Sequence, residues 1–207
     1  ACAPFRRLNL CNKNMVKMDT NNNDGKARHN LLLEVCMAAK YEGQSIRDYY
    51  TIHQETNRGT ASQLCTVLAR SFADIGDIVR GRDLYRGNKQ EKEKRKQLDD
   101  KLKDIFGKIH SEVMKTRGKN AQELQTRYQN DEPNYYQLRE DWWNNNRLMV
   151  WYAITCGAGG GTYFRKTCGS DENHPTATQG NCRCVIGGVP TYFDYVPQYL
   201  RWFEEWA

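Results

Sequence analysis

The stretch SQLCTVLARSFADIGDIVRG, residues 62–81, decides the fold class of this chain. Its large apolar residues recur at spacings of three or four, which is the period of a helix that turns one face towards a core. Glycine at residue 81 follows as a stop signal. The pattern therefore predicts an amphipathic helix with Cys65 beside an apolar stripe made of Leu64, Leu68, Phe72, Ile75 and Val79.

The same period predicts further helices on either side of this stretch. Residues 30–40 carry one apolar face, and Gly43 is read as their stop, so residues 44–62 are expected to form a polar connection. Residues 89–116 are expected to form a long helix whose other faces are charged. Residues 134–155 are expected to form another helix, with large apolar side chains.

Composition places the chain among globular proteins. Its 207 residues suit one domain or two small ones, and 39% hydrophobic residues argue against intrinsic disorder. No run approaches the roughly 18 apolar residues of a membrane helix, so we expect no direct membrane insertion in this segment. Residues 1–10 show no signal-peptide pattern, and any export signal or anchor is expected to lie outside them.

Eight cysteines occur without a single C-x-x-C pair, the spacing that a structural zinc site normally supplies. Disulfides are the better interpretation, and they indicate an oxidising, extracellular compartment. Four bridges would allow about 105 connectivities, so the pairing stays open. Residues 182 and 184 are read as part of a structural knot in the glycine-rich loop region 157–190, not as a redox centre. The disulfide candidates are Cys2, Cys11, Cys36, Cys65, Cys156, Cys168, Cys182 and Cys184. Together with the helices, they predict an all-α fold, a disulfide-tied helical bundle with long loops.

Charge is the most localised feature of the sequence. Residues 86–119 contain twelve Lys or Arg and six Asp or Glu, a net charge of +6 that equals that of the whole chain. Such a stripe attracts a polyanion such as nucleic acid, anionic lipid or a sulfated glycan. It also suits a solvated helix face with opposite charges four residues apart, and the two interpretations weigh about evenly. Nucleic acid is the weaker partner, because no nucleic-acid-binding signature appears.

Signatures of enzymes are absent from the sequence. The glycines at 157–161 lack the strand, helix and Lys-Ser/Thr of a phosphate loop. His29, His53, His110 and His174 are isolated from any catalytic or metal-binding motif. We therefore expect no catalytic residue, no metal site and no cofactor.

Aromatic residues crowd the end of the chain, with seven of them between residues 192 and 206. They could form a platform on which sugars stack. Core packing is the favoured interpretation, because large rings at helical spacing fill the centre of a small bundle.

Six blocks of the sequence together carry a family resemblance. They read CAPFRRLNLC at 2–11, NLLLEVCMAAKYEG at 30–43, SQLC at 62–65, ARSFADIGDIVRG at 69–81, YYQLREDWW at 135–143 and PQYLRWFEEW at 197–206. They closely resemble blocks of a Duffy-binding-like domain of the alpha type, from the erythrocyte membrane protein one family of variant surface antigens of Plasmodium falciparum.

The resemblance implies a cysteine-rich helical adhesion domain, exported to the surface of the infected erythrocyte. Its partners would be a host erythrocyte or endothelial receptor, with heparan sulfate or blood-group sugars among the ligands that some members use for rosetting, and host antibodies, which antigenic variation evades. Family domains are longer than this chain. We therefore expect a partial domain, with residues 1–61 as a portion of the first subdomain and residues 62–207 as the helical core subdomain, truncated at its C-terminus.

Two functions follow as expectations. In the first, the basic stretch contacts sulfated or sialylated glycans of a host receptor. In the second, the segment is a structural and antigenic scaffold whose neighbouring domains carry receptor binding. The glycan-contact residues expected under the first are Arg80, Arg82, Arg86, Lys89, Lys92, Lys94, Arg95 and Lys96.

Overall fold

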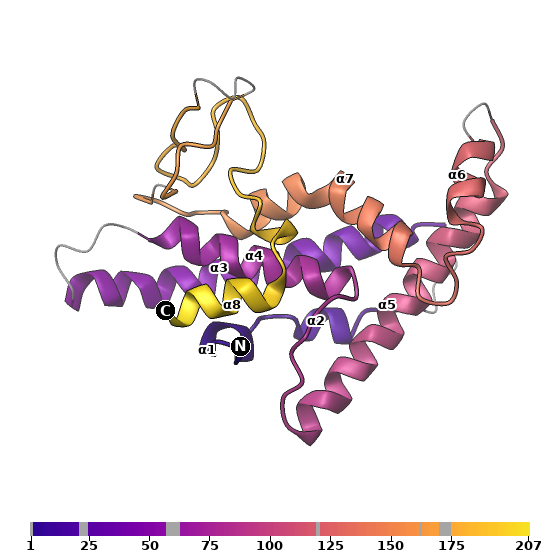
Figure 1. Cartoon of the computed structure of the whole chain (residues 1–207), viewed down its shortest axis with the longest axis horizontal. Helices are drawn as coiled ribbons and strands as arrows, with labels where there is room; N and C mark the ends of the chain where they lie inside the picture. Colours follow the sequence, from indigo (N-terminus) through magenta and orange to yellow (C-terminus); the bar gives the residue numbers. More distant parts are fainter. Residues whose placement is uncertain (1, 21–24, 57–62, 119–120, 162, 170–174) are drawn as a thin grey trace.

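The computed structural model describes residues 2–20, 25–56, 63–118, 121–161, 163–169 and 175–207, with the backbone alone at 51–56. Within these ranges the regular secondary structure is helical, and extended pairing is limited to the isolated bridges Gly161–Asn181 and Cys168–Thr176. The elements are α1 (Phe5–Leu8), α2 (Lys13–Val16), α3 (Ala27–Thr56), α4 (Leu64–Val79), α5 (Lys89–Lys115), α6 (Ala121–Tyr128), α7 (Tyr136–Ile154), the 3₁₀ turn η1 (Phe193–Tyr195) and α8 (Gln198–Trp206) (Figure 1). The all-α expectation is confirmed. In the described part of the chain, none of the helices has the length and apolar content that crossing a bilayer requires.

Helices α3, α4 and α7 pack together to form the body of the molecule (Figure 1). The rings of Trp143 and Trp151 on α7 lie 5.1 and 5.3 Å from the ring of Phe72 on α4, and all three side chains are fully buried. Each indole N–H also has a partner: Trp143 donates to the carboxylate of Asp194, and Trp151 donates to the carbonyl of Cys182. The core is therefore aromatic at its centre, and the indole N–H groups of both tryptophans have hydrogen-bond acceptors.

Three predicted helices are confirmed with small shifts at their ends. The stripe at 62–81 becomes α4, after which Gly81 takes the left-handed backbone at φ +72°. The stretch 89–116 becomes α5, whose first turn is capped by the side chain of Asn88 accepting the N–H of Glu91. The stretch 134–155 becomes α7. The expected subdomain boundary at 61/62 lies outside the described residues.

Helix α3 contradicts the prediction at Gly43. The helix does not stop there but continues to Thr56, so most of the expected polar connection is helical. A Cβ at residue 43 would lie 1.9 Å from the carbonyl oxygen of Ile154, the last residue of α7. Glycine is required at this position because two helices touch, not because one helix ends.

One disulfide ties the loop region 157–190 to the body, and a second closes within that region. Cys65 on α4 bonds to Cys182, and Cys168 bonds to Cys184. The structural knot expected at 182 and 184 is therefore confirmed.

The other four cysteines are free, which corrects the expectation that all eight are disulfide candidates. They lie in separate surroundings: Cys2 beside Trp206, Cys11 beside Glu42, Cys36 on α3, and Cys156 just after α7.

The terminal aromatic residues also depart from the prediction. Trp202 is buried, but Tyr192, Tyr195, Tyr199, Phe203 and Trp206 are exposed. Helix α8 turns only one face inwards, where Gln198 and Arg201 are buried beside Trp202. Most of these rings therefore cover the surface and do not fill the core.

Candidate functional site

The first half of α5 and the turn before it carry a cluster of exposed cations. Arg86, Lys89, Lys92, Lys94 and Lys96 are exposed, and Arg95 is partly buried beneath them. We call these six residues the basic face. In Figure 1, α5 extends from the body with its first turns at the outer end, so this charge is open to a large ligand.

Opposite charges neutralise only part of this face. Lys94 lies 3.7 Å from Glu91 on the same helix. Within the described ranges, Arg86, Lys89, Lys92 and Lys96 take part in no ion pair. The solvated-face interpretation thus accounts for some of the lysines, and the remainder keep an uncompensated positive charge.

Arg80 does not belong to this surface, which corrects its assignment as a glycan contact. Its side chain is 1% exposed. It bonds to the carboxylate of Asp77 at 3.0 Å and lies 3.3 Å from Glu140. It also donates to the carbonyl oxygen of Asp194. Arg80 therefore holds α4, α7 and η1 together. Its neighbour Arg82 is more than half exposed but is paired with Glu140 at 2.9 Å.

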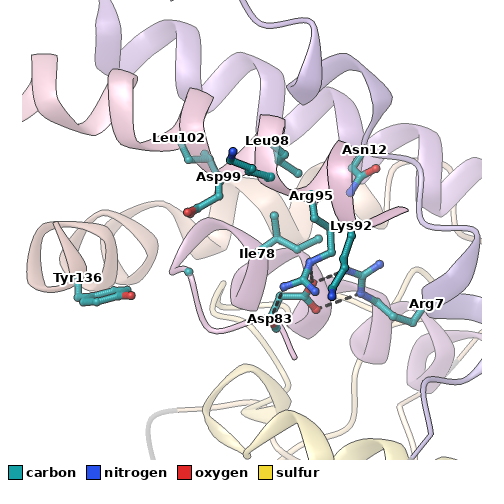
Figure 2. Close-up of a pocket in the computed structure, with 12 residues that line it drawn as sticks. Arg7, Asn12, Ile78, Asp83, Lys92, Arg95, Leu98, Asp99, Leu102 and Tyr136 are labelled. Carbon is teal, nitrogen blue, oxygen red and sulfur yellow. Dashed lines mark hydrogen bonds and ion pairs between the residues drawn. The ribbon is translucent and has the colours of Figure 1, made fainter. Parts of the chain in front are cut away.

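A pocket of about 340 Å³ lies between the basic face and the body (Figure 2). Three elements contribute most of its wall: the N-terminal segment, the turn after α4, and the inner side of α5. We call it the α4–α5 pocket. It is lined by Arg7, Asn12, Ile78, Gly81, Asp83, Lys92, Arg95, Lys96, Leu98, Asp99, Leu102 and Tyr136.

Asp83 anchors the basic face to the body. Figure 2 shows Arg7 and Arg95 converging on it. Arg7 donates from Nε and Nη2 to the two carboxylate oxygens at 3.2 and 2.6 Å. Arg95 donates to the Asp83 carbonyl at 3.0 Å, and its Nε lies 3.5 Å from the carboxylate. Two guanidinium groups on one carboxylate leave a net positive charge at this wall.

The second acid of the pocket is neutralised as well. Asp99 lies 2.9 Å from Lys103 and 3.3 Å from Arg139, which is fully buried. Burial lowers the pKa of Arg139, although Asp99 opposes this effect. Because both acids are engaged by arginines or lysines, Lys92 and Lys96 are left to attract an anion into the pocket. In the described part of the chain, no three His, Cys, Asp or Glu side chains are placed to hold a metal ion.

A buried ion-pair network fixes the elements behind the site. Asp74 on α4 lies 2.8 Å from Arg6 and 2.7 Å from Arg201, and Arg6 also pairs with Glu205 on α8. Although burial alone would raise it, Arg6 and Arg201 hold the pKa of Asp74 below its usual range. Burial raises the pKa of Asp77, which shares Arg201, to about 6.

Sequence reasoning missed Asp74, Asp83 and Arg7. One signal for them was present: Asp74 and Asp77 stand three residues apart within the most apolar helix of the chain. Charged residues are almost never fully buried unless they are paired. Their position therefore indicated buried arginine partners, which only the tertiary structure identifies.

Comparisons with known proteins agree on the family. A model of the Duffy binding domain family matches residues 1–201. The structure is similar to the NTS-DBL1α-1 domain of the Plasmodium falciparum membrane protein 1 (PfEMP1) from the varO strain, at 40% identity and a TM-score of 0.76, over 100% of this chain and 43% of that one. It is also similar to the NTS-DBL1α and CIDRγ double domain from the same strain, at 41% identity and a TM-score of 0.77, over 100% and 27% of the two chains.

A third similar structure is the PfEMP1 IT4var13 DBLβ domain bound to ICAM-1, at 33% identity and a TM-score of 0.71, over 100% of this chain and 44% of that one. The chain thus spans less than half the length of these matched structures. The curated proteins contain no significant match.

Proposed function

This chain belongs to the Duffy binding domain family, and from that premise we propose that it acts as a host-receptor adhesion module whose basic face contacts anionic glycans. The family is one of adhesion domains and not of enzymes. Within this proposal, the chain is part of a variant surface antigen displayed on the infected erythrocyte, where it takes part in cytoadherence or rosetting.

One observation carries the glycan contact: Arg86, in the turn before α5, and Lys89, Lys92 and Lys96, in its first half, are exposed and unpaired within the described residues. Sulfate and carboxylate groups on a flexible sugar chain are recognised by such point charges. The proposal keeps Arg82, Arg86, Lys89, Lys92, Lys94, Arg95 and Lys96 from the sequence prediction and omits Arg80, which is buried.

Heparin chromatography with a salt gradient tests this proposal. We expect the triple variant Lys92→Gln, Lys94→Gln, Lys96→Gln to elute at clearly lower salt than the wild type, because counterion release falls with the number of cations that contact the polyanion. The matched control replaces three exposed lysines outside the site, Lys17, Lys40 and Lys115, by glutamine. Equal retention of the two triple variants would reject the basic face as the contact.

A second function is favoured by the lengths of the matched structures. The DBLβ domain bound to ICAM-1 continues well beyond the 44% that this chain covers. In this alternative the chain is a structural and antigenic scaffold, and neighbouring domains carry receptor binding. Capture of red cells by a longer polypeptide, with none by residues 1–207, would favour the scaffold.

A further inference from the structure

A second hollow lies next to the α4–α5 pocket along α5. Its volume is about 220 Å³, and its walls come from the N-terminal segment, from the turn before α5 and from α5 itself. We call it the α2–α5 pocket. It shares Arg7, Asn12, Arg95 and Leu98 with the first pocket, so the two hollows adjoin each other at these residues. It is lined by Arg7, Leu8, Asn9, Leu10, Asn12, Lys13, Val16, Tyr85, Glu91, Lys94, Arg95 and Leu98.

Cations from two distant parts of the sequence converge on this pocket. Lys13 begins α2 and Lys94 lies in the second turn of α5, and both side chains are exposed. The single acid of its lining is Glu91, which is already placed beside Lys94. Within the described residues Lys13 has no ion-pair partner. An anion in the pocket would therefore meet Lys13 with its charge uncompensated.

The rest of the lining suits the sugar that would carry such an anion. The Asn9 amide nitrogen is engaged with the carbonyl of Phe5, which leaves its side-chain oxygen as an acceptor for a hydroxyl. Asn12 also lines the pocket. Tyr85 is fixed with its ring 4.7 Å from the Arg7 guanidinium. The pocket holds roughly seven times the volume of about 30 Å³ that one water molecule occupies. That is room for an oxyanion and part of a sugar ring.

We propose that the α2–α5 pocket is a subsite of the glycan contact, in which Lys13 and Lys94 hold one sulfate or carboxylate group of an anionic sugar and Asn9 and Asn12 bond to its hydroxyls. This inference rests on the proposed function. It extends the site from α5 onto the N-terminal segment and makes Lys13 a binding residue.

Binding of a fully sulfated heparin tetrasaccharide to the intact chain, measured by isothermal titration calorimetry, tests the subsite. We expect Lys13→Gln to weaken binding by about five- to tenfold, the scale of one ordinary hydrogen bond at an exposed site. The control is Lys17→Gln, an exposed lysine four residues further along that does not line the pocket. It makes the same change in net charge and should alter the Kd less than twofold.

A double-mutant cycle shows whether the two lysines hold the same group. If they do, the loss in Lys13→Gln, Lys94→Gln is smaller than the product of the single losses, because residues that share a partner are not independent. Circular dichroism should show unchanged helicity in each variant, since both side chains are exposed.

The outcomes separate the subsite from the function on which it rests. Equal effects of Lys13→Gln and Lys17→Gln, with binding by the wild type, would overturn the subsite and leave the basic face as the contact. No binding by the wild type to any sulfated or sialylated probe would overturn both. Titration with sialyllactose beside the tetrasaccharide distinguishes the anion: binding of both supports a site that accepts a carboxylate, and binding of the tetrasaccharide alone supports a sulfate site.

Discussion

The carbonyl oxygen of Ile154, at the end of α7, lies directly against the backbone of Gly43 in the interior of α3, where a Cβ would stand 1.9 Å from it. Four residues further along α3, Arg47 donates to the carbonyl of Cys156 at 2.6 Å. The two helices therefore touch at the point where the loop region begins. This contact sets how the disulfide-tied loops leave the body.

Replacing Gly43 by alanine should destabilise the protein strongly. The added methyl group meets backbone atoms that cannot move aside without separating α3 from α7, and forced overpacking costs about 1–3 kcal/mol or more. Urea unfolding followed by circular dichroism measures the loss. Gly159→Ala is the control, because a Cβ there meets no atom within 4 Å. Equal unfolding midpoints for the two variants would contradict the close contact.

Replacing Arg80 by alanine should destabilise the fold, whereas the same change at Arg82 should not. Loss of Arg80 leaves Asp77 without one of its buried partners, and breaking a buried pair costs about 3–5 kcal/mol. Arg82 is exposed, so its pair with Glu140 contributes about 0–1 kcal/mol. Chemical denaturation of both variants compares them. An Arg80→Ala protein with wild-type stability and weakened heparin binding would restore the contact role that its sequence position suggested.

The sequence predicts those parts of the fold that rest on local periodicity. α4, α5 and α7 each carry an apolar stripe long enough to be recognised, and their ends fall near the glycine and cap signals. Gly43 shows why the rest could not be predicted. In a sequence, a glycine that permits close helix contact is identical to one that ends a helix. α6 has only eight residues, too few for its period to stand out.

The site was predictable only as a charged stretch. The run of lysines in α5 located the basic face. Which of its cations are free to contact a ligand, and which are paired with the body of the protein, depends on their neighbours in the tertiary structure. Arg80 and Arg82 are two residues apart, yet Arg80 is buried and Arg82 is exposed. Lys13 lies 81 positions before Lys94, and no local pattern connects them. Their convergence follows from how the N-terminal segment packs along α5.

Alkylation of the folded, unreduced protein should distinguish the eight cysteines. With iodoacetamide at pH 8, we expect rapid modification of Cys2 and Cys156, which are exposed. Cys11 should react slowly, because burial and the nearby Glu42 raise its pKa to about 11 and the thiolate is the reactive form. Burial raises the pKa of Cys36 as well. Peptide mass spectrometry gives the order, with denatured and reduced protein as the control for full labelling. Rapid labelling of Cys65 or Cys182 would contradict the disulfide assignment.

The two disulfides should contribute unequally to stability. Cys65 and Cys182 are separated by 117 residues, whereas Cys168 and Cys184 are separated by 16. In the chain-entropy model a 100-residue loop is stabilised by about 4.7 kcal/mol and a 15-residue loop by about 3 kcal/mol. Removing Cys65–Cys182 by paired alanine substitutions should therefore lower the free energy of unfolding by about 1–2 kcal/mol more than removing Cys168–Cys184. A larger loss from the shorter loop would mean that the loop region carries more of the fold than its position suggests.

Stability should fall steeply below about pH 4, and Asp74 should account for part of the fall. Because the folded-state pKa of Asp74 lies below its value of about 3.9 in an unfolded chain, its contribution is complete above that pH and is lost as the pH drops towards the folded value. Asp77 acts in the opposite direction: with a folded-state pKa of about 6, it favours the folded protein as the pH falls from about 6 to about 4.

Melting temperatures of the wild type and of Asp74→Asn, measured between pH 2 and pH 7, separate these effects. The variant should be less stable at neutral pH, because Arg6 and Arg201 lose their shared carboxylate. It should then lose less of its remaining stability below pH 4, since the group that takes up the proton is gone. Parallel curves for the two proteins below pH 4 would show that other carboxylates control the acid unfolding. The ion pairs that hold the N-terminal segment and α8 against α4 would then lack the pH dependence that their geometry implies.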